Sequence, residues 1–195
     1  MKRIIFIAVS LILMLSPILT YASDKNYSLD DKGNVVFTVV LENLQLKKEE
    51  IHEAALKYLQ NAYKDTRYEI SLNNKEKGIL VGNGSFLAFY ESSNLIKTST
   101  YNVDFWVRID SKDSRARLQF IAKQYSITSL SDLKDNEKQN IDICTVAPLA
   151  ENKENKKDFS KAFEKFKQLV DKTLKIIKEE IESTPAQMEL IEEEW

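Results

Sequence analysis

Between residues 101 and 123, apolar and polar positions alternate almost without a break. Period-2 alternation is typical of a strand with one face on a core and the other toward water. The alternation resumes after a polar turn at 111–114, so it predicts an antiparallel β-hairpin. The residues predicted to point inward are Tyr101, Val103, Phe105, Val107, Ile109, Ala116, Leu118, Phe120 and Ala122.

Two other segments have the helical period. Over 46–64 and over about 156–181, apolar residues fall three and four positions apart, which is typical of amphipathic helices. Glu49 and Glu50 lie in the first turn of the earlier helix, where the helix dipole favours carboxylates. Each helix has a single apolar stripe and the hairpin has a single apolar face, so we expect both helices on one face of one sheet.

Three further runs predict strands, at 35–41, 68–72 and 79–90. Gly82-Asn83-Gly84 lies inside the last of them and predicts a β-bulge or a close backbone approach. Residues 126–155 are mostly polar and are predicted to form a linker, with one candidate for a short extra strand at 141–146. The order strand, helix, four strands, helix predicts an α+β fold with an antiparallel sheet and two helices on one face.

The N-terminal residues have the composition of a signal peptide. Lys2 and Arg3 precede an apolar run over 4–19, and Thr20-Tyr21-Ala22 offers a cleavage site after Ala22. A retained membrane anchor is the alternative, but the run is short for a bilayer and contains Pro17. We therefore expect an exported protein, in the periplasm or at the cell surface, without stable membrane insertion once residues 1–22 are removed.

Past the leader, we expect a flexible lead-in over 23–33, one α+β domain over 34–183 and a loose acidic tail over 184–195. The net charge is −2, and it becomes −4 without Lys2 and Arg3, which argues against a nucleic-acid partner. Cys144 is the single cysteine, so no internal disulfide forms, and we interpret it as a small buried residue.

Known catalytic and metal-binding motifs are incomplete in this sequence. His52 is the single histidine, and the position four residues later is Leu56, so the helix pattern of zinc hydrolases is not met. The stretch Gly82 to Ser85 lacks the remaining residues of a dinucleotide loop, a phosphate loop or a hydrolase elbow. We therefore predict no catalytic residue, no cofactor and no metal.

The candidate site is on the polar face of the strand over 101–109. There Asp104, Trp106 and Arg108 offer a carboxylate, an indole and a guanidinium on a sheet face that no predicted helix covers. The alternative is that the linker or the tail covers Trp106. The function we expect is a non-enzymatic binding module of the cell envelope, whose partner is a protein, a peptide or a glycan. The alternative function is a carboxylate-based hydrolase, which requires two acids that converge in a pocket.

Four segments also resemble a known family: the strand VVFTVVLENL, the helix EEIHEAALKYLQNAY, the segment GILVGNGSF and the hairpin YNVDFWVRID…RARLQFIAKQY. Over about Val35 to Ser126 they are similar to the exported Bacteroidota family known as domain of unknown function 4468. The resemblance implies a single copy of the fold of TATA-binding protein and assigns no activity. TATA-binding protein binds DNA with two such copies joined into a saddle, so a comparable saddle here would need a homodimer. DNA binding itself does not follow from the fold.

Overall fold

The computed structural model describes residues 26–62, 69–93, 97–131, 140–144 and 157–193. In these ranges the chain forms an antiparallel sheet in the order β1-β2-β6-β5-β4-β3, and β7 pairs with the second half of β6. The strands are β1 (Ser28–Leu29), β2 (Val35–Glu42), β3 (Glu69–Asn74), β4 (Ile79–Ser93), β5 (Lys97–Lys112), β6 (Arg115–Ser131) and β7 (Asn140–Cys144). The helices are α2 (Lys48–Ala62) and α4 (Lys157–Glu193).

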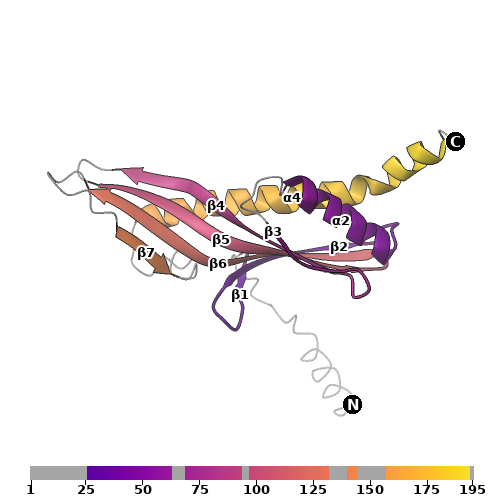
Figure 1. Ribbon diagram of the computed structural model, residues 1–195, viewed down its shortest axis with the longest axis horizontal. Helices are drawn as coiled ribbons and strands as arrows, with labels where there is room; N and C mark the ends of the chain where they lie inside the picture. Colours follow the sequence, from indigo (N-terminus) through magenta and orange to yellow (C-terminus); the bar gives the residue numbers. More distant parts are fainter. Residues whose placement is uncertain (1–25, 63–68, 94–96, 132–139, 145–156, 194–195) are drawn as a thin grey trace, which may run out of the picture.

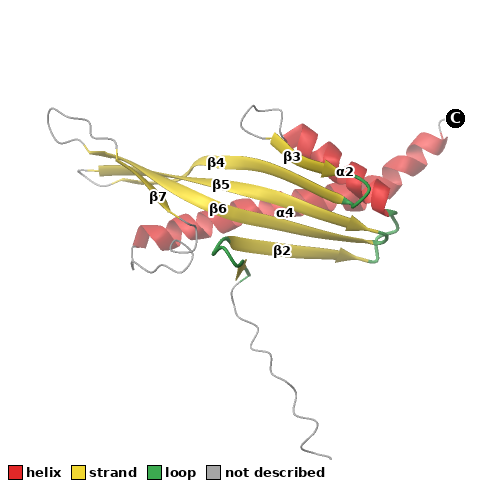
Figure 2. Cartoon of the chain, turned by 60° about the horizontal axis from the view of Figure 1, so that its bottom comes forward, coloured by secondary structure: helices red, strands yellow, loops and turns green. Residues whose placement is uncertain are grey.

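Both helices lie on the same side of the sheet (Figure 1). Helix α4 runs along the length of the long strands, and α2 lies beside it near one end of the sheet (Figure 2). An ion pair of 3.2 Å between Lys57 Nζ and Glu180 Oε1 joins the two helices. The predicted fold class, an α+β domain with both helices on one face, is confirmed.

An aromatic cluster fills the space between the sheet and α4. Phe105 and Phe120 lie on neighbouring strands with ring centroids 4.4 Å apart, and Phe166 of α4 packs on Phe120 at 5.9 Å. Phe37 of β2 reaches the same α4 ring at 5.9 Å. All nine residues predicted to point inward from the hairpin are buried, because period-2 alternation puts them on the face under the helices.

The tip of the β5–β6 hairpin is bonded to the start of α2. The Asp113 carboxylate accepts a hydrogen bond of 2.9 Å from the backbone N–H of Lys48. The first amides of a helix have no intrahelical acceptor, so this carboxylate caps the N-terminus of α2. Ser114 N donates to Leu46 O at 2.9 Å, and Leu44 N donates to Ser114 O at 3.1 Å. The hairpin tip is therefore bonded both to the segment before α2 and to the first residue of α2.

The predicted flexible lead-in over 23–33 is wrong for its second half. Asp30 Oδ1 accepts the backbone N–H groups of Lys32 and Asn34, and Oδ2 accepts Asn34 Nδ2, so one carboxylate closes the turn between β1 and β2. Gly33 supplies the positive φ of 77° that this turn needs. Burial would raise the pKa of Asp30, but the hydrogen bonds from Asn34 and Lys32 outweigh it and lower the pKa. The short strand β1 was missed because two residues carry no periodicity.

The predicted linker and tail are both shorter than expected. Strand β6 continues to Ser131, so residues 126–131 belong to the sheet, and the candidate extra strand is present as β7. Helix α4 continues to Glu193 through Pro185, where a loose tail was predicted. Thr184 Oγ1 donates to Glu180 O at 2.9 Å, whereas the carbonyl that lacks a helical donor because Pro185 has no N–H is that of Ile181. The remaining linker residues, 132–139 and 145–156, and the final 194–195 lie outside the described residues.

An irregularity adjoins the predicted bulge at Gly82-Asn83-Gly84, because Ile70 pairs with Gly82 and Leu72 with Val81, which leaves Ser71 of β3 as the extra residue. The β4–β5 register is unbroken from Ile79 to Phe86 and shifts between Phe86 and Tyr90, where Ala88 has a φ of 48°. Gly82 and Gly84 are buried between Leu80 and Phe86 on the helix-facing side. The ladder is therefore irregular at Gly82, as predicted, but the extra residue there belongs to β3.

Candidate binding surface on the helix-free face of the sheet

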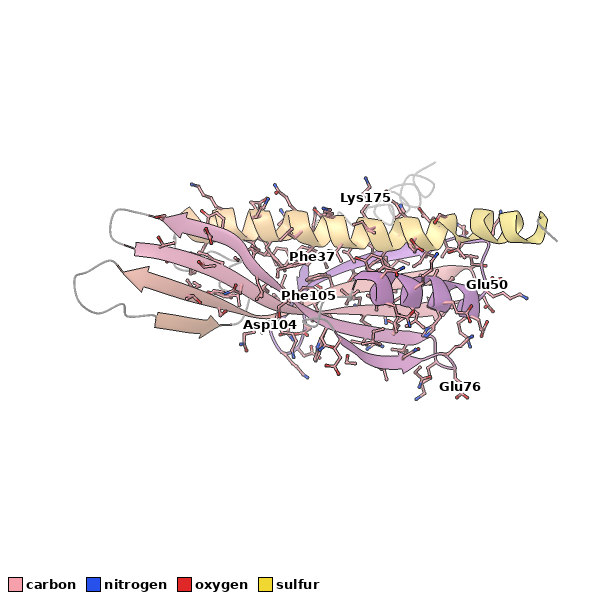
Figure 3. The ribbon with its side chains drawn as sticks, turned by 45° about the horizontal axis from the view of Figure 1, so that its top comes forward. Phe37, Glu50, Glu76, Asp104, Phe105 and Lys175 are labelled. Atoms are coloured by element: carbon pink, nitrogen blue, oxygen red, sulfur yellow. The ribbon has the colours of Figure 1, made fainter. Side chains whose placement is uncertain are left out.

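The even-numbered residues of β5 from 102 to 110 point to the side of the sheet opposite the helices. Figure 3 shows Phe105 directed toward α4 and its neighbour Asp104 directed away from it. We call this side the open face. Trp106 lies within it, because the β-ladder pairs Trp106 with Asn83 of β4 and with Ile121 of β6, which in turn pairs with Val36 of β2.

Trp106 is half-buried, and one face of its ring is covered by a lysine. Lys123 Nζ lies 3.9 Å from the ring centroid, which is a cation–π distance. Lys123 is the extra residue of a β-bulge, because Asp104 pairs with Gln124 while the next residue, Phe105, pairs with Ala122. The bulge thus places an ammonium group over the indole, an arrangement that the period-2 pattern does not reveal.

Asp104 does not contact Arg108, its expected neighbour. Its carboxylate accepts a hydrogen bond of 2.5 Å from Ser85 Oγ on β4. The two side chains share a shallow pocket of about 190 Å³ with Trp106 and Lys123. Asn83 also lines this pocket, and its buried Oδ1 has no hydrogen-bond donor among the described residues. A ligand N–H or O–H could satisfy that acceptor.

Arg108 is part of a different cluster, centred on Asp110. Arg108 Nε donates to Asp110 Oδ1 at 2.9 Å, and Arg117 donates through Nε and Nη2 to Oδ2 at 2.9 and 2.6 Å. The Asp110 side chain is only 15% exposed. Burial would raise the pKa of Asp110, but the hydrogen bonds and charges of the two arginines outweigh it, and the pKa is lowered.

A second concavity adjoins this cluster at the hairpin end of the open face. Asp110, Lys112, Arg115 and Arg117 line it, and its volume is about 260 Å³; we call it the basic pocket. Arg115 also pairs with Glu42 of β2 at 3.4 Å. Sequence reasoning missed this pocket, although the hairpin turn contains the signal. Counting back from a two-residue loop at Asp113-Ser114 puts Asp110 directly opposite Arg117.

The three residues predicted to form the site therefore share one face of β5 but do not form one cluster. Trp106 and Asp104 line the shallow pocket, and Arg108 points to Asp110 two residues further along the strand. Because successive side chains on one face of a strand are about 7 Å apart, Arg108 can reach Asp110 more readily than Asp104, which is twice as far away.

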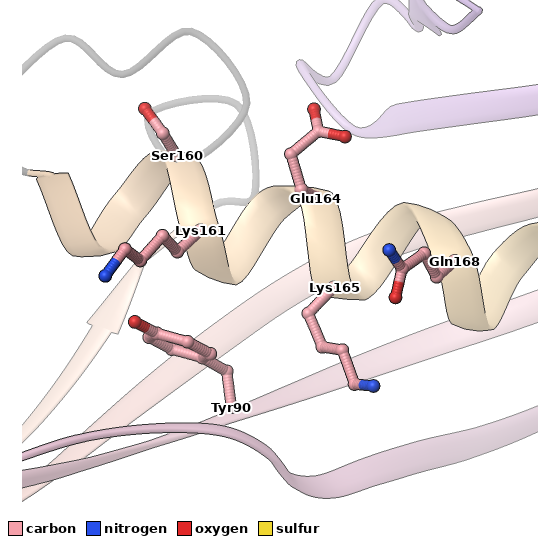
Figure 4. A pocket seen from close by; sticks show the side chains of 6 residues that line it. All are labelled: Tyr90, Ser160, Lys161, Glu164, Lys165 and Gln168. Atoms are coloured by element: carbon pink, nitrogen blue, oxygen red, sulfur yellow. The ribbon is translucent and has the colours of Figure 1, made fainter.

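A groove on the helix side separates Tyr90 of β4 from α4 (Figure 4). It has a volume of about 410 Å³ and is lined on the helix by Ser160, Lys161, Glu164, Lys165 and Gln168. At its end, Ser92 Oγ donates to Asp158 Oδ2 at 2.6 Å. Burial and the nearby Asp158 raise the pKa of Tyr90, and burial, Asp158 and Tyr90 raise the pKa of Tyr101 to about 12. These groups join the first turn of α4 to the sheet.

Among the described residues, two acids line the same pocket. Glu42 and Glu182 line a cavity of about 320 Å³, but their side chains are well exposed and each is ion-paired, Glu42 with Arg115 and Glu182 with Lys178. An acid–base pair needs one carboxyl group in a desolvated setting, which neither of these has. The described part of the chain also contains no group of three or more His, Cys, Asp or Glu side chains suited to a metal.

His52 takes no part in the open face. His52 is buried on α2, and its Nε2 lies 2.7 Å from Asn73 Oδ1 on the edge strand β3. It therefore links a helix to the sheet, as a structural histidine does. The side chain of Cys144, at the end of β7, is outside the described residues, so its predicted burial stays a prediction.

Comparison with known proteins identifies the class to which this domain belongs. Residues 37–126 match the model of the family described as domain of unknown function (DUF4468) with TBP-like fold. Residues 37–126 are therefore similar to this family, and the predicted resemblance is confirmed.

Two solved structures are similar to the chain. One is a TBP-like protein from Parabacteroides distasonis ATCC 8503, with a TM-score of 0.59, 16% identity, and coverage of 80% of this chain and 97% of the other. The other is a DUF4468 family protein from Bacteroides ovatus ATCC 8483, with a TM-score of 0.43, 16% identity, and coverage of 60% and 66%. At this identity the first structure supports the fold alone. No curated protein matches the chain.

No helix in the described ranges is both long enough and apolar enough to cross a membrane. The predicted signal peptide over residues 1–22 lies outside those ranges, so export stays a prediction.

Proposed function

We propose that this domain is a non-enzymatic binding module of the cell envelope that recognises a protein, peptide or glycan through its open face. The observation that carries the proposal is the position of Trp106, which is half-buried within the face opposite both helices. Tryptophan and arginine are enriched among the residues that dominate binding energy at interfaces, and both are present on this face.

Apolar side chains extend the open face on both sides of Trp106. Val40 of β2 is 42% exposed, and Leu72 of the edge strand β3 is 45% exposed. Between them lie the partly buried Val81, the ion-paired Arg117 and the half-buried Arg108. A mixture of aliphatic, aromatic and paired charged groups is typical of protein interaction surfaces and lacks the dense positive charge of nucleic-acid interfaces.

The cell-envelope location rests on the N-terminal sequence. The basic start, the apolar run and the Thr20-Tyr21-Ala22 site favour export and removal of residues 1–22. The family adds no activity of its own, and no described pocket favours the hydrolase alternative, because the one pair of acids that shares a cavity is exposed and ion-paired.

The proposal is tested by capture of the partner. The tagged chain over 23–195 is incubated with envelope extract, and the captured material is compared with that of Trp106→Ala and of Ile176→Ala, which removes an exposed apolar side chain from α4. We expect Trp106→Ala to lose the partner and Ile176→Ala to keep it, with both variants folded. Retention of the partner by folded Trp106→Ala would show that the binding surface is elsewhere.

A further inference from the structure

We infer that the basic pocket binds a carboxylate group of an acidic, extended peptide segment, which then runs along β5 toward Trp106. Two observations point there: an excess of positive charge at the hairpin end of the open face, and a tip that holds those charges in fixed positions. The inference refines the proposed function by naming the class of partner, and only its Trp106 end depends on that proposal.

The charge around the basic pocket is unbalanced in favour of cations. Lys112, Arg115 and Arg117 line it together with Asp110, and Arg108 binds the same carboxylate from the neighbouring position. The sixth member is Glu42, whose carboxylate pairs with Arg115; both side chains are more than half exposed. Four cationic side chains therefore meet two carboxylates in a chain whose net charge is negative. Such a local excess attracts an anionic group.

Asp110 orients the two guanidinium groups that it binds. Arg117 donates through Nε and Nη2 to Asp110 Oδ2, so among the described residues its Nη1 keeps its donors for another acceptor. Arg108 likewise contacts Asp110 Oδ1 through both Nε and Nη2. A guanidinium fixed in this way loses less conformational freedom when an oxyanion binds, which is the benefit of preorganisation.

The backbone beneath the pocket is also fixed. Ser111 N donates to Gly78 O at 2.7 Å, Ser114 is bonded to the chain before α2, and Asp113 is bonded to the first residue of α2. A side chain at Gly78 would meet Ser111 O at 2.3 Å, and its φ is 63°, so the two turns pack against each other without room for a Cβ atom. The Asp113 carboxylate caps α2, so its negative charge is already engaged by the helix.

A carboxylate suits this pocket better than a phosphate dianion. Asp110 and Glu42 remain in or beside the pocket, and they oppose a second negative charge on the ligand. A guanidinium binds a single carboxylate well in a bidentate geometry.

The surroundings favour a peptide over an acidic sugar. Val40 pairs directly with Arg117 in the ladder and is 42% exposed, and Ile79 pairs with Asp110 on the other side. Aliphatic side chains flanking the cations suit the alternating side chains of an extended peptide. Sugar rings bind tryptophan through an open ring face, and Lys123 covers one face of Trp106.

The geometry also gives the length of the segment. Asp110 and Trp106 are four residues apart on β5, which corresponds to about 13 Å at the rise of a strand. An extended peptide with its acidic residue in the basic pocket would thus bring an apolar residue four positions away to Trp106.

The experiment uses a fluorescent, amidated pentapeptide with glutamate at its first position and valine at its third and fifth, which share one face of an extended chain, and a matched peptide with glutamine in place of glutamate. Binding to the chain over 23–195 is measured by fluorescence anisotropy at low and moderate salt. We expect the glutamate peptide to bind about tenfold more tightly than the glutamine peptide, with a difference that shrinks as salt increases.

Lys112→Ala and Arg117→Ala should each reduce that preference by about threefold or more. Lys112 is exposed and forms no ion pair among the described residues, so its removal tests binding without disturbing the fold. Lys175→Ala removes an equal charge from α4, where the lysine is 72% exposed, and should leave binding unchanged. Equal binding of the two peptides, equal losses in Lys112→Ala and Lys175→Ala, or tighter binding of oligogalacturonate or inorganic phosphate than of the glutamate peptide would overturn the inference.

The two proposals fail separately. If Trp106→Ala binds the glutamate peptide normally while Arg117→Ala loses the preference, the carboxylate site stands and the central role of Trp106 does not. If Trp106→Ala loses the captured envelope partner while Lys112→Ala and Arg117→Ala show no preference change, the open face binds a partner and the acidic-peptide inference is wrong.

Discussion

The two faces of β5 differ sharply in burial. From Tyr101 to Ile109 the odd-numbered residues are buried under the helices, and the even-numbered residues between them are half-buried or exposed. Both sets share one backbone and one ladder. On the covered face the ring of Phe105 packs against Phe86 at 4.6 Å and Phe120 at 4.4 Å, whereas on the open face the contacts are mainly hydrogen bonds and ion pairs.

This difference separates stability from recognition within one strand. Apolar packing under the helices removes surface from water and depends on shape, so it should dominate the free energy of unfolding. Ion pairs on the open face gain little from their partly solvated setting, yet they fix the positions of charges that a partner can meet. Variants at neighbouring positions of β5 can therefore test the two roles separately.

The largest expected effect follows removal of a ring from the covered face. Phe105 is 3% exposed and lies within the aromatic cluster, so Phe105→Ala should lower the free energy of unfolding by about 3–5 kcal/mol. Trp106→Ala, one position away, should cost clearly less, because the indole is only half-buried. Urea unfolding of both variants measures the difference. Equal losses would mean that the open face contributes to stability as much as the core.

The alternation along β5 and β6 is also why the fold was predictable from the sequence. The apolar residues of the hairpin all lie on one face of the sheet, and the apolar stripes of the two helices can pack only on that face. The sheet and its covered side therefore follow from the sequence pattern alone. Contacts that depend on a single side chain produce no periodic pattern in the sequence, so they were not predicted. The turn closed by Asp30, the continuation of α4 through Pro185 and the bulge that puts Lys123 over Trp106 each depend on one residue in its three-dimensional setting.

For the candidate site, the sequence predicted the face of the sheet but not the contacts between its side chains. Alternation placed Asp104, Trp106 and Arg108 on the open face, but it did not identify which carboxylate Arg108 would bind. Asp104 and Asp110 both lie on that face, and the choice depends on the strand register that sets Arg117 opposite Asp110. Arg117, which alternation predicts to be a solvated outward residue, is instead one of the two donors to a largely buried carboxylate.

A smaller effect is expected at alkaline pH, at the end of the covered face. Tyr101 is 4% exposed, and its pKa is raised to about 12 by burial and by Asp158 and Tyr90. Because the folded chain holds the proton more tightly than the unfolded chain, the stability contribution is complete below pH ~10 and is lost as the pH rises from about 10 to 12. A two-unit shift corresponds to roughly 2–3 kcal/mol. In Tyr101→Phe the stability should fall less steeply over this window in urea melts; an unchanged slope would contradict the assignment.

The smallest effect is expected at Asp110, on the open face. Asp110→Asn keeps the shape of the side chain but removes the charge that both arginines share, so we expect a loss on the order of 1 kcal/mol at neutral pH, within the range for partly solvated ion pairs. The pKa of Asp110 is lowered, which means that its contribution is present above the unfolded value of about 4 and is lost as the pH falls through the folded value.

The difference in stability between Asp110→Asn and the unaltered chain should therefore shrink as the pH is lowered below about 4, since the native carboxyl also becomes neutral there. Asp104→Asn is the matched control, because this carboxylate lies on the same strand and face but is exposed, and among the described residues its hydrogen bond is to Ser85. It should cost less at neutral pH. If the two variants lose the same stability, then the second arginine adds nothing to the Asp110 cluster. The basic pocket would then lack the rigid guanidinium groups on which carboxylate binding depends.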